Sequence, residues 1–216
     1  NDPAGPGARR CGGAYGGTLR SGTLATNDAV SGGGAAYTHL SNALVYANTA
    51  TDGGGTYDAV AVLSLVSNNT AAAAGGGGVS GTFDRCIIVH NSAADAGGVD
   101  SATLDSSLII RNRASDDAGG ARNSLLRNCT VADNSAGNAG GGAHGGAAYN
   151  TILYDNTAAV SNNIDGTTYD RICAPEATGA NNVAADPRFI NPSRDDYDLQ
   201  VGSPCIDAGD NAYVET

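Results

Sequence analysis

The chain has 216 residues, of which 32 are Gly and 5% are aromatic, with neither Trp nor Met. Its net charge is −11, and all 11 of its basic residues are Arg. An acidic chain with no basic cluster does not suit nucleic acid or an anionic membrane surface, and no stretch approaches the ~20 apolar residues that span a bilayer. Because Met is missing even at position 1, we expect a processed form or fragment of an exported protein, with any signal peptide already removed.

Residues 1–18 combine Gly and Pro with no apolar run, which predicts an irregular N-terminal segment. Residues 19–160 then carry a repeating unit, and residues 161–216 lose it. The repeat is marked by seven asparagines at spacings of 21, 21, 22, 21, 22 and 22 residues: Asn27, Asn48, Asn69, Asn91, Asn112, Asn134 and Asn156.

The positions before each asparagine have a constant character. The third position before it is always aliphatic, and the fifth is always small. Positions two apart face the same side of a strand, so both point into a narrow interior. A helix cannot explain so short a repeat with glycines in every copy, whereas a parallel solenoid places like residues in columns about 4.8 Å apart. We therefore predict an all-β parallel β-helix of about seven coils.

Each asparagine then has a structural role at a bend between strands. We expect its side chain to tolerate left-handed backbone geometry and to pass amide hydrogen bonds from coil to coil. The Gly-Gly pair that follows supplies positive φ at the next corner and lets neighbouring backbones approach closely.

The residues two and four positions before each asparagine should point outward and form an apolar face several coils long, which a soluble monomer rarely exposes. We expect either the C-terminal segment or another copy of the chain to cover this face. Its large members are Leu44, Tyr46, Leu65, Ile87, Val89, Leu108, Ile110, Ile152 and Tyr154.

The five cysteines divide by position. Cys86 and Cys129 share the small inward column but lie two coils apart, about 9.6 Å, which exceeds the separation that a disulfide tolerates, so we expect both to be buried thiols. Cys173 and Cys205 both lie in the aperiodic tail, where a disulfide between them is the favoured pairing. Cys11 remains, either free or linked elsewhere.

The repeat resembles the right-handed parallel β-helix repeats of bacterial secreted and surface proteins, including the polymorphic outer-membrane type. The tail segment 185–210, with Asp186-Pro187-Arg188-Phe189 and Gly202-Ser203-Pro204-Cys205-Ile206-Asp207-Ala208-Gly209, is similar to the ending of choice-of-anchor β-helix proteins. This resemblance implies a right-handed β-helix, export and a cell-surface or extracellular location, but no single activity.

Residues for catalysis are sparse. A polysaccharide lyase would use the arginines between Arg111 and Arg127, although a salt-bridged surface is the simpler interpretation. Asp95 and Asp116 share an outward column and could hold Ca²⁺, but water-exposed turn residues are the alternative. The histidines occupy three different repeat positions, which argues against a metal cluster.

We therefore expect an extracellular structural protein without a catalytic site, whose copies assemble as a filament or surface layer through the solenoid ends and the apolar face. The alternatives are a carbohydrate-binding or lyase-like β-helix and an adhesin fragment. The expected partners are copies of the chain and, in the alternative, a polysaccharide; no cofactor is expected other than the Ca²⁺ considered above.

Overall fold

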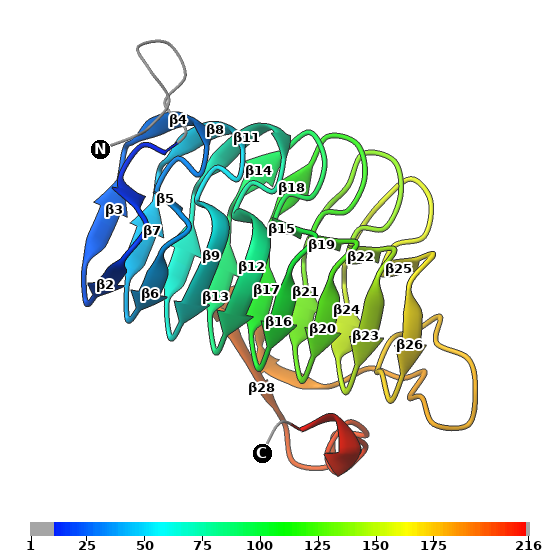
Figure 1. Ribbon diagram of the computed structural model, residues 1–216. Coiled ribbons are helices and arrows are strands. Elements are labelled where there is room, and N and C mark those ends of the chain that lie inside the picture. Colours follow the sequence, from blue (N-terminus) through cyan, green and yellow to red (C-terminus); the bar gives the residue numbers. More distant parts are fainter. Residues whose placement is uncertain (1–10, 215–216) are drawn as a thin grey trace.

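A computed structural model describes residues 11–214, and in it the chain winds into a parallel β-solenoid (Figure 1). In Figure 1 the chain descends the sheet nearest the viewer, returns upward behind it and advances from left to right along the axis, so the winding is right-handed. The all-β fold expected from the repeat is confirmed. Within residues 11–214 the helical elements are two 3-10 turns, η1 (Pro192–Arg194) and η2 (Asn211–Tyr213), and no helix is long and apolar enough to cross a membrane.

Three parallel sheets form the solenoid. The fourteen-stranded sheet is formed by β1 (Ala14–Tyr15), β2 (Thr18–Arg20), β5 (Ala35–Ala36), β6 (His39–Ser41), β9 (Thr56–Val62), β12 (Gly78–Asp84), β15 (Val99–Asp100), β16 (Thr103–Asp105), β19 (Ala121–Arg122), β20 (Leu125–Arg127), β22 (Ala143–His144), β23 (Ala147–Tyr149), β25 (Ile164–Asp165) and β26 (Thr168–Asp170).

The seven-stranded sheet lies behind it and consists of β3 (Thr23–Ala25), β7 (Leu44–Tyr46), β10 (Leu65–Ser67), β13 (Ile87–Val89), β17 (Leu108–Ile110), β21 (Thr130–Ala132) and β24 (Ile152–Tyr154). The five-stranded sheet closes the coil with β4 (Asp28–Ser31), β8 (Thr49–Asp52), β11 (Thr70–Ala74), β14 (Ser92–Ala93) and β18 (Arg113–Ala114). A separate antiparallel hairpin, β27 (Phe189–Asn191) and β28 (Asp196–Leu199), belongs to the C-terminal segment.

The solenoid is longer at both ends than the range 19–160 expected from the repeat. At its start, Ala14 and Tyr15 already pair with Ala35 and Ala36, although no apolar run marks them. At its end, β25 and β26 continue the ladders of the fourteen-stranded sheet. Backbone pairing extends the coil here because it does not depend on the asparagine spacing by which the repeat is recognised. Of the expected N-terminal segment, residues 1–10 lie outside the described range.

The core is built from the inward columns that the repeat predicts. Phe83, Leu104 and Ile109 are fully buried, in the same ladders as the smaller Ala61 and Val66. Cys86 and Cys129 are buried thiols in this core, with relative exposures of 1% and 2%. Burial disfavours the thiolate, which raises the pKa of Cys86 to about 11 and that of Cys129 to about 12.

The asparagines form a continuous buried hydrogen-bond ladder. Each side-chain oxygen accepts from the backbone N–H and the Nδ2 of the asparagine one coil earlier, as when Asn69 donates both to Asn91 Oδ1 at 2.9 Å. The second Nδ2 proton goes to a backbone carbonyl of the preceding coil; Asn91, for example, donates to the carbonyl of Val66 at 3.0 Å. Every polar atom of an internal asparagine therefore has a partner, as burial requires.

The left-handed residue at this bend is not the asparagine, which corrects the expectation. It is the preceding residue in every coil: Thr26, Ala47, Asn68, His90, Arg111, Asp133 and Asp155, with φ between 52° and 57°. The physical reason is that the asparagine must present both its backbone N–H and its side chain to the next coil. The bend is therefore made one residue earlier, by residues of many types.

The glycines meet two separate demands. Gly32, Gly53 and Gly75 take positive φ at the corner, a position that Ala96 and Ala118 fill in later coils. The following glycines are needed for close approach, since a Cβ on Gly54 would lie 2.6 Å from the carbonyl oxygen of Gly76 in the next coil. In the last coil, where no further coil follows, residues 162–163 replace them.

The ladder ends on a carboxylate. Asn163 occupies the next rung after Asn156, accepting from Asn156 Nδ2 at 2.9 Å, and it donates its own N–H and Nδ2 to Glu176, each at 2.9 Å. Glu176 also accepts from the N–H of Ile164. The C-terminal end of the solenoid is thus closed by an acceptor that matches the donors of the last rung.

Candidate functional site

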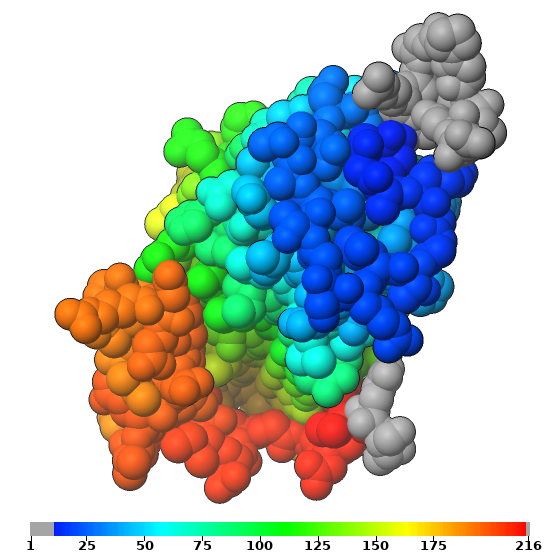
Figure 2. All heavy atoms as spheres, turned by 90° about the vertical axis from the view of Figure 1, so that its left-hand side faces the viewer, coloured from blue at the N-terminus to red at the C-terminus, as the bar shows by residue number. Residues whose placement is uncertain are grey.

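The C-terminal segment covers one half of the apolar face of the seven-stranded sheet. Phe189 and Tyr197 pack on Ile110 and Ala132, whose exposures are 2% and 0%. Val89, Leu108, Ile152, Tyr154 and Leu199 complete this cluster. In Figure 2 the segment, orange to red, lies beside and below the solenoid, with a hollow between them. The expectation that this segment folds back over the face is therefore met for β17, β21 and β24.

The other half of the face remains open. Leu44, Tyr46 and Ile87 are 45%, 41% and 44% exposed, and Leu65 beside them is half-buried. Their side chains stand in register on β7, β10 and β13. We call the outward side of β3, β7 and β10, together with Ile87 of β13, the uncovered half-face; Val89 of β13 belongs to the covered cluster. The sequence pattern gave the whole face, but not the boundary between its two halves.

Polar contacts fix the hairpin on the covered half. Arg111 forms an ion pair with Asp195 and donates to the carbonyl of Pro192, both at the tip of the hairpin. The Tyr197 hydroxyl donates to Asp133, at a bend of the solenoid. Burial and this acceptor carboxylate both raise the pKa of Tyr197. Arg111 therefore anchors the C-terminal segment and does not contribute to an arginine cluster.

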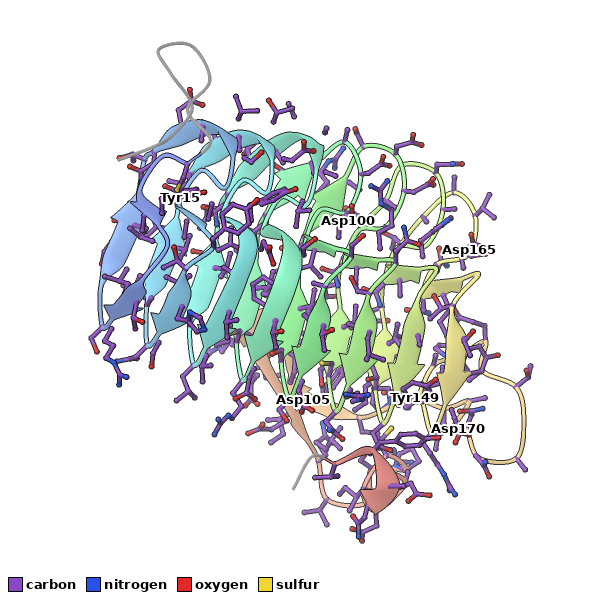
Figure 3. All side chains as sticks on the ribbon, in the orientation of Figure 1. Tyr15, Asp100, Asp105, Tyr149, Asp165 and Asp170 are labelled. Atoms are coloured by element: carbon purple, nitrogen blue, oxygen red, sulfur yellow. The ribbon has the colours of Figure 1, made fainter. Side chains whose placement is uncertain are left out.

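A second attachment lies where the lower edge of the fourteen-stranded sheet turns toward the seven-stranded sheet. Tyr213 stacks on Tyr149 with ring centroids 4.7 Å apart and donates to Asp170 at 3.0 Å. Asn150 exchanges two hydrogen bonds with the backbone of Asp210, at 2.8 and 2.9 Å. Figure 3 shows Tyr149 and Asp170 at this edge, next to η2.

Beside the second attachment is a cavity of about 380 Å³ lined by both the last coils and the C-terminal segment. Cys173 and Cys205 are on its wall. The disulfide expected between them is not formed: both are free thiols, and the Cys173 thiol donates to the carbonyl of Ala185. The fold thus brings together the two residues that the sequence paired, in the reduced state.

The expected lyase-like arginine surface is dispersed. Arg111 lies at the bend after the seven-stranded sheet, Arg113 lies on the five-stranded sheet, and Arg122 and Arg127 lie on separate rows of the fourteen-stranded sheet. The spacing along the chain suggested a cluster, but each coil distributes neighbouring residues around its circumference. These arginines do not converge on one substrate.

An ion ladder that the sequence analysis missed runs along the upper row of this sheet. Arg122 makes two 3.0 Å bonds to Asp100, and its Nη1 lies 2.6 Å from Asp95. One coil further, His144 Nδ1 lies 3.1 Å from Asp165 without hydrogen-bond geometry. Figure 3 places Asp100 and Asp165 along this row. Asp100, Arg122, His144 and Asp165 follow one another at intervals of about one repeat, and this spacing in the sequence could have revealed the ion ladder.

The candidate Ca²⁺ residues do come together. Ligand atoms of Asp95, Asp116 and Asp117 lie within 4.8 Å of one another. Two of the three are already engaged, however. Arg122 pairs with Asp95, and Asp117 accepts from Asn138 at 2.9 Å and from the N–H of Ala139 at 3.0 Å. The guanidinium offsets part of the negative charge that would attract a cation.

A tyrosine column is the second feature that the sequence analysis missed. Tyr15, Tyr37 and Tyr57 pack edge to face, with centroids 5.5 and 5.9 Å apart, at the N-terminal end of the fourteen-stranded sheet. Tyr15 and Tyr37 are 43% and 46% exposed. On the lower half of the same coils is a groove of about 260 Å³, lined by Thr18, Arg20, His39, Leu40, Ser41, Val60 and Val62. The three tyrosines are spaced 22 and 20 residues apart in the sequence, and this near-repeat spacing could have revealed the column.

Comparison with known proteins gives no relative from which a role could be transferred. No family model matches the chain, and neither a curated protein nor a solved structure is significantly similar to it. The structure itself establishes the architecture, which is a parallel β-solenoid repeat with a C-terminal segment packed on one sheet.

Proposed function

We propose that the chain is an exported structural protein of a bacterial cell surface whose copies associate laterally through the uncovered half-face. The observation that carries this proposal is the exposure of Leu44, Tyr46 and Ile87 on a flat, regular sheet. The covered half of the same sheet indicates what such a surface binds, since there it packs against another apolar β-element of this chain.

Charge favours a second copy as the occupant. The chain carries a net charge of −11, yet none of the outward positions of the uncovered half-face is charged: Thr23, Ala25, Leu44, Tyr46, Leu65, Ser67 and Ile87. Two acidic copies can approach here without placing carboxylates opposite each other, whereas a strongly basic partner would find nothing to pair with.

The size of the surface sets the strength of the contact. Four strands spaced about 4.8 Å apart, each about 10 Å long, present roughly 200 Å² per copy. A stable complex buries about 800 Å² per partner, so a single contact through this surface is weak. Association would become effective where copies are concentrated, as in a surface layer or a bundle of filaments.

Assembly through the ends of the solenoid is less favourable at the C-terminal end. Glu176 already satisfies the donors of the last asparagine rung, and residues 172–183 pair with one another and with the last coil. A contact through this end would displace these bonds. The contact that we propose between copies is therefore the lateral uncovered half-face and not the ends of the solenoid.

Sedimentation velocity over a concentration series tests the proposal. We expect weak, reversible self-association that Leu44→Asp and Ile87→Asp abolish, because each would place a charge in the contact. Leu44→Thr is the variant least able to disturb the fold, since Thr23 and Thr130 occupy the same column. Val201→Asp is the matched control, being fully exposed outside the half-face. A particle that stays monomeric at its highest soluble concentration would refute the proposal.

The tyrosine column supports carbohydrate binding as a second candidate function. Exposed tyrosine rings offer apolar faces to sugar rings, and Arg20, His39 and Ser41 in the adjacent groove supply donors for hydroxyl groups. A glycan array with wild type, Tyr37→Ala and the Leu44→Asp variant separates the two candidates. Binding lost only in Tyr37→Ala supports this function, and binding unaffected by Tyr37→Ala excludes the column as its site.

A further inference from the structure

Cys173 and Cys205 join two parts of the molecule that are otherwise held by noncovalent contacts. Cys173 follows the last full coil, forms a parallel bridge with Ile152 and is 3% exposed. Cys205 belongs to the C-terminal segment and is half-buried. Both cysteines line the cavity between the segment and the last coils, where the Cys173 thiol donates to the carbonyl of Ala185.

The other cysteines are placed differently. Cys86 and Cys129 lie inside the solenoid, two coils apart, and their sulfurs donate to backbone carbonyls of Ala61 and Arg127. Cys11 lies just before β1 at the start of the solenoid, whereas Cys173 pairs with Ile152 in the last coils, and the Cys11 thiol donates to the carbonyl of Ala14. Within residues 11–214, the pair of Cys173 and Cys205 is therefore the one whose oxidation would connect the segment to the solenoid.

We propose that Cys173 and Cys205 are an oxidative latch, whose disulfide fastens the C-terminal segment over the seven-stranded sheet. The oxidant is a small-molecule disulfide. The Cys205 thiolate attacks it, forming a mixed disulfide and expelling one thiolate. Cys173 then loses its proton and attacks Cys205 Sγ, expelling the second. Two protein thiols become one disulfide, and the two electrons reduce the small disulfide to two thiols.

The order of these steps follows from the geometry. Cys205 is the more exposed of the two, so it meets the oxidant first. The neighbouring Cys173 side chain lowers the pKa of the Cys205 thiol, while interaction with Cys205 and burial raise the pKa of Cys173. The buried partner is then adjacent to the mixed disulfide and resolves it.

The latch would determine how much of the apolar face is open. The hairpin that covers Ile110 and Ala132 lies between the two cysteines in sequence, so the disulfide would hold it within a closed loop. In the reduced protein, opening of the segment would extend the uncovered half-face over β17 and β21. This last consequence rests on the proposed self-association, whereas the latch itself does not.

Peptide mapping of the full chain tests the site directly. The chain has no Lys, and trypsin cleavage after Arg171, Arg188 and Arg194 separates the two cysteines into peptides 172–188 and 195–216. After incubation of the folded protein with oxidised glutathione, we expect these two peptides as a cross-linked pair. Cys205→Ser should abolish the pair. Cys86→Ser is the matched control and should retain it, because Ser64 and Ser107 show that serine fits that column.

Two results would overturn the latch. One is glutathione adducts, or links to the remaining cysteines, without the 172–188/195–216 pair. The other is unchanged hydrogen exchange over residues 189–199 on oxidation, where we expect protection to rise about tenfold in wild type and not in Cys205→Ser. If the pair forms while the oxidised and reduced proteins both stay monomeric, the proposed self-association fails and the latch stands.

Discussion

The asparagine ladder predicts a large difference between two chemically identical substitutions. Asn91→Ala removes an internal rung. It leaves the N–H and Nδ2 of Asn69 without their acceptor and removes one of the donors to the carbonyl of Val66. Each buried polar group that loses its partner costs about 1–3 kcal/mol, so for the two Asn69 donors we expect a loss of roughly 2–6 kcal/mol, at the lower end if water enters.

Asn27→Ala removes the first rung, where the cost should be small. Within residues 11–214, the Asn27 side chain makes one hydrogen bond, to Asn48 at 2.9 Å, and it is only partly buried. We expect a loss of about 1 kcal/mol. The two variants delete the same atoms, so the difference between them isolates the position in the ladder.

Urea denaturation followed by circular dichroism measures both variants under one set of conditions, with oligomeric state held fixed by working at low concentration. Asn91→Asp adds a sharper comparison. It keeps an acceptor for Asn69 but replaces the two donated protons by a carboxylate oxygen facing Asn112 Oδ1 and the Val66 carbonyl, so it should be at least as damaging as Asn91→Ala. Equal losses for Asn27→Ala and Asn91→Ala would show that the ladder is not a source of stability.

Three further predictions concern the cap, the corners and the thiols. Tyr197→Phe should cost about 1 kcal/mol and speed hydrogen exchange over β27 and β28, because it removes the bond to Asp133, whereas Tyr15→Phe at an exposed site should change neither. Gly54→Ala should destabilise by about 3 kcal/mol or more, since its Cβ would overlap backbone atoms of Thr70 and Gly76; Gly17→Ala, with open space but φ of 73°, should cost only about 1 kcal/mol by thermal denaturation. Because burial raises the folded-state pKa of Cys86 to about 11 and of Cys129 to about 12, the unfolded chain ionises first; stability should therefore fall as pH rises from about 8.5 toward 11, and the double variant to Ser should flatten that decline in urea titrations. A pH profile identical in wild type and double variant would contradict this assignment.

The sequence by itself determined the solenoid. A fixed interval between Asn48, Asn69 and Asn91, with an aliphatic residue always three positions earlier, is sufficient because a parallel stack converts a period along the chain into contact between identical positions. The same logic gave the inward columns, the burial of Cys86 and Cys129, and the outward apolar face. Prediction from the repeat was most accurate for residues whose surroundings consist of the equivalent residues in the neighbouring coils.

The tertiary structure decided everything that departs from the period. The half of the face beneath Phe189 and Tyr197 is covered because an aperiodic hairpin reaches it, and no spacing encodes where that hairpin lies. Glu176 completes the asparagine ladder through a contact that likewise follows no repeat. The arginines near Arg111 separate for the opposite reason, since positions close along the chain are carried to different sides of the coil. Periodicity fixes contacts between equivalent residues, whereas contacts between unlike segments depend on how the chain folds back in three dimensions.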